Sequence, residues 1–179
     1  MYMLSRLRLV AYGLSLAGAG AAAIAIVLIA AVILLEICLR TFFATSTFMS
    51  DELVGYLVGA ICFLPLGYAF GEGGLLRVNL LLDRLKDSPR ARRVVEIGCV
   101  VLTLGIIGLL IWYVYANVSR QFGRGYVSGT ISGIPQWIPT GTMLIGLAIF
   151  WFQVLVYGIG LVVGGQTLIE EIADETAIG

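Results

Sequence analysis

The charged residues of this 179-residue chain are confined to short segments, and four long stretches between them carry no charged side chain. These stretches cover residues 9–35, 53–71, 97–119 and 125–169. A helix of about 20 predominantly apolar residues crosses the hydrocarbon core of a bilayer. Each of the first three stretches therefore predicts one membrane-spanning helix.

The fourth stretch is long enough for two helices, but its first part disfavours a second one. It contains helix-breaking residues among Ser and Thr, namely Gly125, Gly129, Gly133, Pro135 and Pro139. Such a segment would leave backbone groups unpaired in lipid. The sequence therefore predicts an all-α integral membrane protein, a single domain over residues 1–179, with four transmembrane helices at about 10–35, 53–71, 96–119 and 137–163.

Composition excludes several classes of function. Only 12% of the residues are charged, and the 11 basic and 11 acidic side chains cancel, so no basic field exists to bind nucleic acid. The chain has no His, which removes imidazole-ligated haem and zinc sites and every catalytic triad that uses His. Cys38, Cys62 and Cys99 lie too far apart for a CxxC motif. We therefore expect neither an enzyme nor a cofactor.

The first stretch has an alternative interpretation as a cleaved signal peptide. Arg6 and Arg8 precede it, and the small residues 19–23 resemble a cleavage site. The apolar run continues well beyond them to Leu35, which favours a helix that is retained.

Lys and Arg are distributed unequally between the two sides of the predicted bundle. The N-terminus and the loop after the second span carry eight of them, whereas the opposite side carries three. Because Lys and Arg are enriched in cytoplasmic segments, both termini are predicted to face the cytoplasm.

A short amphipathic segment lies between the second and third spans, at about residues 75–87. Leu75, Val78, Leu82 and Leu85 share one helical face, which predicts a short helix lying in the cytoplasmic interface. An extension of the second span is the alternative, and the glycines at 71, 73 and 74 disfavour it. Basic residues of this region are candidate anchors to lipid phosphates: Arg77, Arg84, Arg90, Arg92 and Arg93.

Small residues recur every four positions in two of the spans. They are Gly13, Ala17, Ala21 and Ala25 in the first span and Gly160 and Gly164 in the fourth. Small side chains let helices approach closely, so these faces are predicted to pack against a helix of this chain or of another chain.

The ionisable residues lie at the ends of the spans and never at their centres. Glu36 and Arg40 are four apart and are predicted to pair on one helical face. Asp51 and Glu52 open the second span, with Ser50 as a candidate cap. These structural roles are favoured over direct substrate binding, which indicates a helper subunit of a larger membrane complex. Two alternatives remain open: a stand-alone homo-oligomeric transporter that uses Glu36 or Glu96 as its coupling carboxylate, and a scaffold or assembly subunit of another complex.

Several motifs give the chain a family resemblance. It resembles the small membrane subunit (DctQ-type) of tripartite ATP-independent periplasmic (TRAP) transporters over most of its length. The resemblance rests on Arg40 with Phe42–Phe43, Asp51–Glu52, Tyr56–Leu57, Phe63–Leu64, Gly67, residues 73–79 (GGLLRVN), residues 83–85 (DRL) and residues 133–137 (GIPQW). The chain departs from the family pattern at Leu75, where a His is frequent, and at Asn79, where an Asp is frequent.

The resemblance implies a three-part, sodium-driven transporter of organic acid anions in a bacterial or archaeal cytoplasmic membrane. The partners would be a large elevator-type membrane subunit, which binds the sodium, a soluble extracytoplasmic binding protein, and membrane lipids. The small subunit would brace the large one and help to dock the binding protein. Charged residues on the outer side are the docking candidates: Arg40, Asp51, Glu52, Arg120 and Arg124.

Overall fold

The computed structural model describes residues 2–47, 49–72, 89–129 and 132–164. The helices of this part are α1 (Tyr2–Phe43), α2 (Ser50–Phe63), α3 (Leu66–Gly71), α5 (Pro89–Arg124) and α6 (Trp137–Gly164). Because α2 and α3 follow one another within a single span, four spans are long and apolar enough to cross a membrane. The four predicted transmembrane helices are therefore confirmed. The predicted interfacial helix at 75–87, with Arg77 and Arg84, lies outside the described residues.

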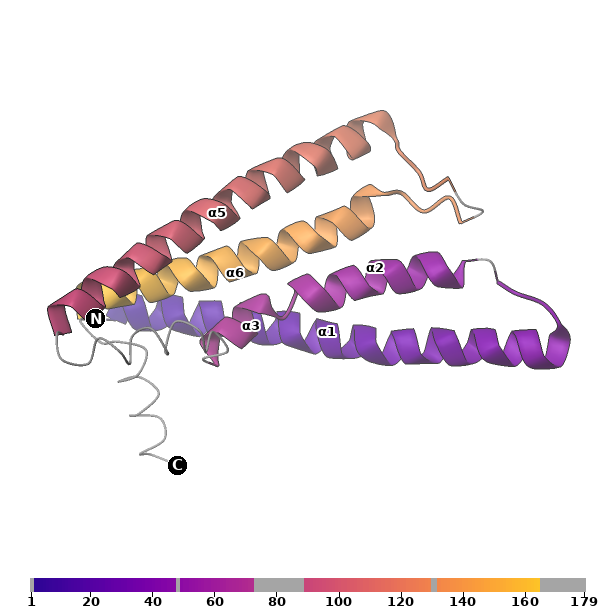
Figure 1. The fold of residues 1–179 in the computed structure, drawn as a ribbon, viewed down its shortest axis with the longest axis horizontal. Coiled ribbons are helices and arrows are strands. Elements are labelled where there is room, and N and C mark those ends of the chain that lie inside the picture. Colours follow the sequence, from indigo (N-terminus) through magenta and orange to yellow (C-terminus); the bar gives the residue numbers. More distant parts are fainter. Residues whose placement is uncertain (1, 48, 73–88, 130–131, 165–179) are drawn as a thin grey trace, which may run out of the picture.

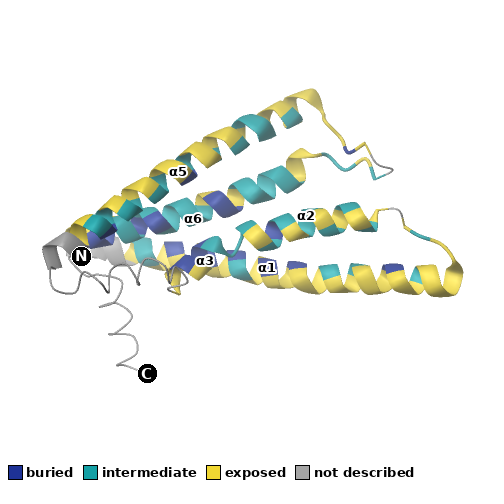
Figure 2. Cartoon of the chain, in the orientation of Figure 1, coloured by how far each residue is buried: buried dark blue, intermediate teal, exposed yellow. Residues whose placement is uncertain are grey.

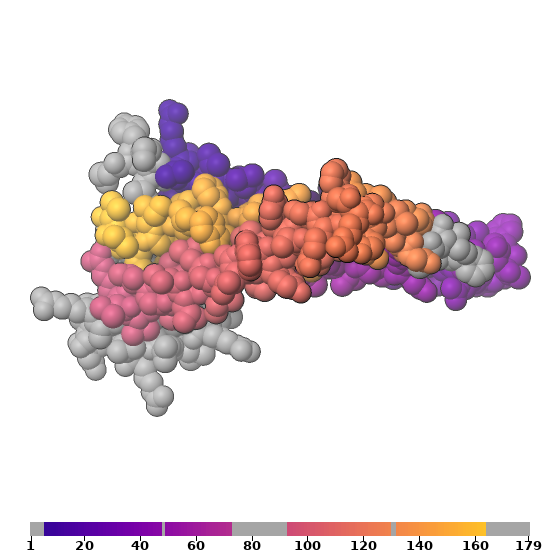
Figure 3. Space-filling view, turned by 90° about the horizontal axis from the view of Figure 1, so that it is seen from above, coloured from indigo at the N-terminus to yellow at the C-terminus, as the bar shows by residue number. Residues whose placement is uncertain are grey.

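The connections α1–α2 and α5–α6 lie at the same end of the bundle, which we call the loop end (Figure 1). The opposite end, where α1 begins and α6 ends, is the terminal end. Helix α6 packs against α1, α2, α3 and α5, whereas α5 packs mainly against α6. At the terminal end α6 lies between α1 and α5, as the yellow, indigo and pink surfaces of Figure 3 show. Helix α6 is therefore the centre of the bundle, and α1 and α5 form its two edges.

Helix α1 has 42 residues, far more than the predicted range of 10–35. At about 1.5 Å per residue it is about 63 Å long, roughly twice the thickness of a bilayer core. It continues past Glu36 and Arg40 because a charged pair at this spacing stabilises a helix rather than ending it.

The second span is broken, which the sequence analysis did not predict. Helix α2 ends at Phe63, a turn follows at Leu64–Pro65, and α3 begins at Leu66. Proline lacks the backbone N–H and its ring crowds the preceding turn, so a helix breaks there. Two glycines from other helices pack directly against the backbone of this break. A Cβ at Gly18 of α1 would lie 2.5 Å from the Leu64 carbonyl oxygen, and one at Gly146 of α6 would lie 2.5 Å from the Phe63 carbonyl.

The buried residues form a narrow strip along the contacts between helices, and the outer faces are exposed (Figure 2). On α1 this strip comprises Ala11, Ser15, Gly18, Ala22, Ala25 and Glu36. The predicted stripe matches it only at Ala25, since Gly13, Ala17 and Ala21 are exposed. A spacing of four drifts by about 40° per step around a helix with 3.6 residues per turn, whereas alternating steps of four and three stay on one face. These three residues therefore do not pack within the described part of the chain, and their packing against another chain stays a prediction.

The second predicted pair of small residues lies at the end of α6. Gly160 is buried, and a Cβ there would lie 2.7 Å from the Arg8 guanidinium, so α1 and α6 are close at this point. The surroundings of Gly164 lie outside the described part of the chain.

Candidate functional site

Polar side chains gather at both ends of the bundle, and at the loop end they surround Glu36. Arg40 Nε donates to Glu36 Oε1 at 2.9 Å, which confirms the predicted pair. The hydroxyls of Thr47 and Ser50 each donate to Oε2 at 2.7 Å, and Ser46 donates to Oε1. Glu36 is 8% exposed. This carboxylate therefore fastens the end of α1 to the start of α2.

The predicted role of Ser50 as a helix cap is wrong. Ser50 is the first residue of α2, Met49 precedes it without a side-chain capping bond, and the Ser50 hydroxyl donates to Glu36 instead. A capping side chain accepts a hydrogen bond from a backbone N–H of the first turn, whereas the Ser50 hydroxyl acts as a donor to a carboxylate.

A second carboxylate at the loop end, Glu52, contacts the α5–α6 connection. Ser132 Oγ donates to Glu52 Oε2 at 2.5 Å, and the Tyr56 hydroxyl donates to Oε1. Within this connection, Val127 and Pro135 form an isolated antiparallel bridge. The sequence indicated only a Gly/Ser-rich loop here; its described residues 125–129 and 132–136 are bridged to one another and attached to α2.

The other predicted docking residues face outwards. Asp51, Arg120 and Arg124 are all exposed. Arg120 Nε donates to the Ala116 carbonyl at 3.2 Å, and Arg124 Nη1 donates to the Tyr126 hydroxyl at 3.2 Å. The structure therefore separates the five candidates. Arg40 pairs with Glu36 but stays exposed, like Asp51, Arg120 and Arg124, whereas Glu52 faces the connection.

A third carboxylate, Glu96, lies at the terminal end between α5 and α6. It is 2% exposed and accepts a hydrogen bond from the Tyr157 hydroxyl of α6. One turn nearer the helix start, Arg93 Nη2 donates to the Leu161 and Val162 carbonyls at 3.0 and 3.3 Å. Arg93 thus satisfies carbonyls near the end of α6, where a cation also complements the helix dipole. The side chains of the other candidate anchors, Arg90 and Arg92, lie outside the described residues.

Removing the Tyr157 hydroxyl is expected to weaken the packing of α5 on α6. Tyr157→Phe deletes one donor to a buried carboxylate, which costs on the order of 1–3 kcal/mol. The free energy of unfolding, measured in detergent micelles, should fall accordingly. Tyr113→Phe is the matched control, since Tyr113 lies on α5 and is 64% exposed; it should change stability by about 0.5 kcal/mol or less. Equal stability of the two variants would contradict the role assigned to Tyr157.

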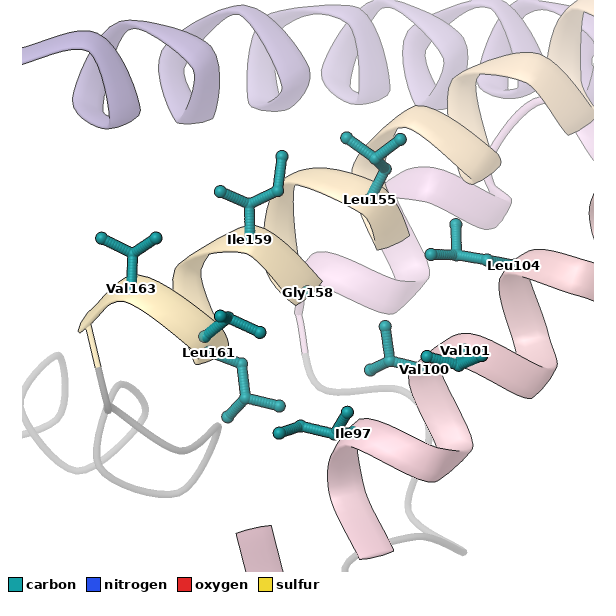
Figure 4. A pocket seen from close by; sticks show the side chains of 10 residues that line it. Ile97, Val100, Val101, Leu104, Leu155, Gly158, Ile159, Leu161 and Val163 are labelled. Carbon is teal, nitrogen blue, oxygen red and sulfur yellow. The ribbon is translucent and has the colours of Figure 1, made fainter. Parts of the chain in front are cut away.

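An apolar groove of about 310 Å³ runs between α5 and α6 on the terminal half of the bundle (Figure 4). Residues of two helices line it: Ile97, Val100, Val101 and Leu104 of α5, and Leu155, Gly158, Ile159, Leu161, Val162 and Val163 of α6. Gly158 has no side chain. A Cβ at this position would lie 2.8 Å from Cγ1 of Val100, so the glycine leaves room for Val100. None of the described residues that line the groove has a polar side chain that would orient a soluble substrate.

Comparison with known proteins decides the family. The family model described as "Tripartite ATP-independent periplasmic transporters, DctQ component" matches residues 29–162, about three quarters of the chain. The chain belongs to this family. No curated protein and no solved structure matches it.

DctQ membership makes the chain a component of a transporter that also has a large membrane subunit and a periplasmic binding protein. Three of the carboxylates in this DctQ component, Glu36, Glu52 and Glu96, hold helices and connections of the chain together. Sequence reasoning found Glu36 with Arg40, because their spacing is local. It missed the partners of Glu52 and Glu96, which lie 80 and 61 residues away along the chain.

Proposed function

We propose that this DctQ component is the accessory small subunit of a sodium-driven, binding-protein-dependent secondary transporter for organic acid anions. It braces the large elevator subunit in the membrane and helps to dock the binding protein. The observation that carries the proposal is the family match over residues 29–162. Glu36, Glu52 and Glu96 are hydrogen-bonded to other residues of this chain. This supports an accessory role, because a carboxylate that couples ion binding to transport must exchange its partners during the transport cycle.

The bracing role is supported by the exposed apolar faces of the two edge helices. On α1 these faces include Ile24, Val27 and Leu34, each more than 60% exposed. On α5 they include Leu109 and Trp112, at 67% and 69%. Apolar surface of this extent is stable only against lipid or another membrane chain. A stationary subunit with such edges enlarges the footprint of the scaffold on which an elevator domain moves.

The loop end is proposed to face the binding protein and the terminal end the cytoplasm. Eight of the 11 Lys and Arg residues belong, in the sequence, to the N-terminus and the segment between the second and third spans, and cytoplasmic segments carry the excess of these residues. Arg40, Asp51, Arg120 and Arg124 would then be exposed charges on the docking side. Sodium and the organic acid are assigned to the large subunit.

Reconstitution in proteoliposomes tests the proposal. The large subunit, the binding protein and this chain together should take up substrate when a sodium gradient is imposed. Omitting this chain should abolish uptake, and the chain alone should take up nothing. Uptake by this chain alone would instead support a stand-alone transporter, and full uptake without it would contradict the accessory role.

A further inference from the structure

We propose that Glu52 is a positioning residue that latches the α5–α6 connection onto α2 and so fixes the surface on which the binding protein docks. The inference rests on the proposed docking function. The sequence suggested that Glu52 contacts the binding protein directly. Here its carboxylate instead holds the α5–α6 connection in place. Residues 125–129 and 132–136 form the part of the connection that we call the outer turn.

The outer turn has little internal support of its own. Ser128 N donates to the Ile134 carbonyl at 2.9 Å and Gln136 N to the Tyr126 carbonyl at 3.0 Å, around one isolated bridge. Gly125 and Gly133 have φ of +60° and +56°, a conformation that glycine adopts without strain. A two-stranded ribbon of this size is marginally stable in water unless it packs on something else.

Glu52 supplies that external support from a different helix. One carboxylate oxygen accepts from Ser132, and that hydroxyl also accepts from Ile134 N at 3.4 Å, within the same strand of the turn. The other oxygen accepts from Tyr56, whose hydroxyl is hydrogen-bonded to Ser128 in the opposite strand. Both strands of the outer turn are therefore tied to one carboxylate.

The outer turn supplies the aromatic part of a basic and aromatic surface at the end of α5. Arg120 and Arg124 lie one turn apart at the end of α5, and both are exposed. Arg124 donates to the hydroxyl of Tyr126, which is 46% exposed and whose carbonyl accepts from Gln136 within the turn. Two exposed guanidinium groups, one of them hydrogen-bonded to an exposed tyrosine, fit a partner surface that carries carboxylates. We therefore assign this surface to an acidic patch of the binding protein.

The decisive substitution is Ser132→Ala, which removes a donor to Glu52 and leaves every charge in place. The transporter complex, in lipid nanodiscs, is examined first by hydrogen exchange without the binding protein. The amides of Ser128 and Gln136 should exchange about tenfold faster, as expected for loss of one hydrogen bond to a charged group, while the amide of Leu147 in α6 stays unchanged. Unchanged exchange in the outer turn would overturn the latch.

Docking is measured next, with the purified, fluorescently labelled binding protein of the same transport system as the probe. Ser132→Ala should weaken its affinity about tenfold, and Glu52→Ala at least as much. Asp51→Asn is the control for the hydrogen-exchange measurement, since Asp51 neighbours Glu52 and is exposed. It should leave exchange of the outer turn unchanged. Faster exchange with unchanged affinity would overturn the positioning role.

A direct contact between Glu52 and the binding protein gives a different pattern. Glu52→Gln keeps an oxygen acceptor and loses the charge, so the latch predicts a smaller loss of affinity than for Glu52→Ala. Loss of affinity in Glu52→Gln with normal exchange in the outer turn would overturn the proposal in favour of direct contact. If the unmodified complex does not bind the binding protein at all, the proposed docking function fails, whereas the exchange result still decides whether the latch exists.

Discussion

Gly146→Ala is expected to destabilise the protein by about 1–3 kcal/mol, the range seen when a packed site receives an extra methyl group. The added Cβ would lie 2.5 Å from both the carbonyl carbon and the carbonyl oxygen of Phe63, and 2.9 Å from the backbone nitrogen of Leu64. These are backbone atoms at the break between α2 and α3, so no side-chain rotation relieves the clash. The free energy of unfolding in detergent micelles measures the effect.

Gly141→Ala, in the same helix, should shift stability in the opposite direction. A Cβ there meets nothing within 4 Å. Alanine is favoured over glycine in a helix by about 1 kcal/mol, so this variant should be as stable as the unmodified chain or slightly more stable. Equal losses at positions 141 and 146 would show that the contact with the break does not determine the packing of α6.

Glu36→Ala is expected to separate the end of α1 from the start of α2. The substitution removes the common acceptor of Arg40, Thr47 and Ser50, whose donor groups then have to find water. Because several hydrogen bonds to a charged group are lost together, the loss of stability should exceed that of Thr47→Ala. Hydrogen exchange of the Leu53 amide, which donates to the Met49 carbonyl at 3.0 Å, reports on the first turn of α2.

Asp51→Asn provides the comparison for Glu36. Both acids lie at the loop end, but Asp51 is exposed. The asparagine variant should leave Leu53 exchange unchanged. Similar effects of the two substitutions would contradict a specific role for Glu36 in closing the α1–α2 connection.

The four transmembrane helices were predictable because the exclusion of charge from lipid is a property of the sequence alone. The pair Glu36–Arg40 was predictable for a related reason: both residues lie on one helix, so their spacing fixes their separation. The start of α6 at Trp137 followed from the Gly/Ser-rich segment that precedes it.

The side of α1 that faces the bundle was not predictable. Small residues occupy several faces of this helix, and both Ala21 (exposed) and Ala22 (buried) fit a generic small-residue pattern. The break at Pro65 had a signal in the sequence, but a proline inside a membrane helix also occurs in helices that only kink. The attachment of Ser132 to Glu52 depends on how α2 and α6 pack, which local spacing does not determine.

The central claim, that this chain is the small subunit of a tripartite transporter, is tested most directly by purification from native membranes. The tagged chain is extracted in a mild detergent, and the proteins that copurify are identified by mass spectrometry and quantified. We expect one polytopic membrane protein in 1:1 stoichiometry, large enough for about a dozen spans. A homo-oligomer of this chain without any membrane partner would contradict the account.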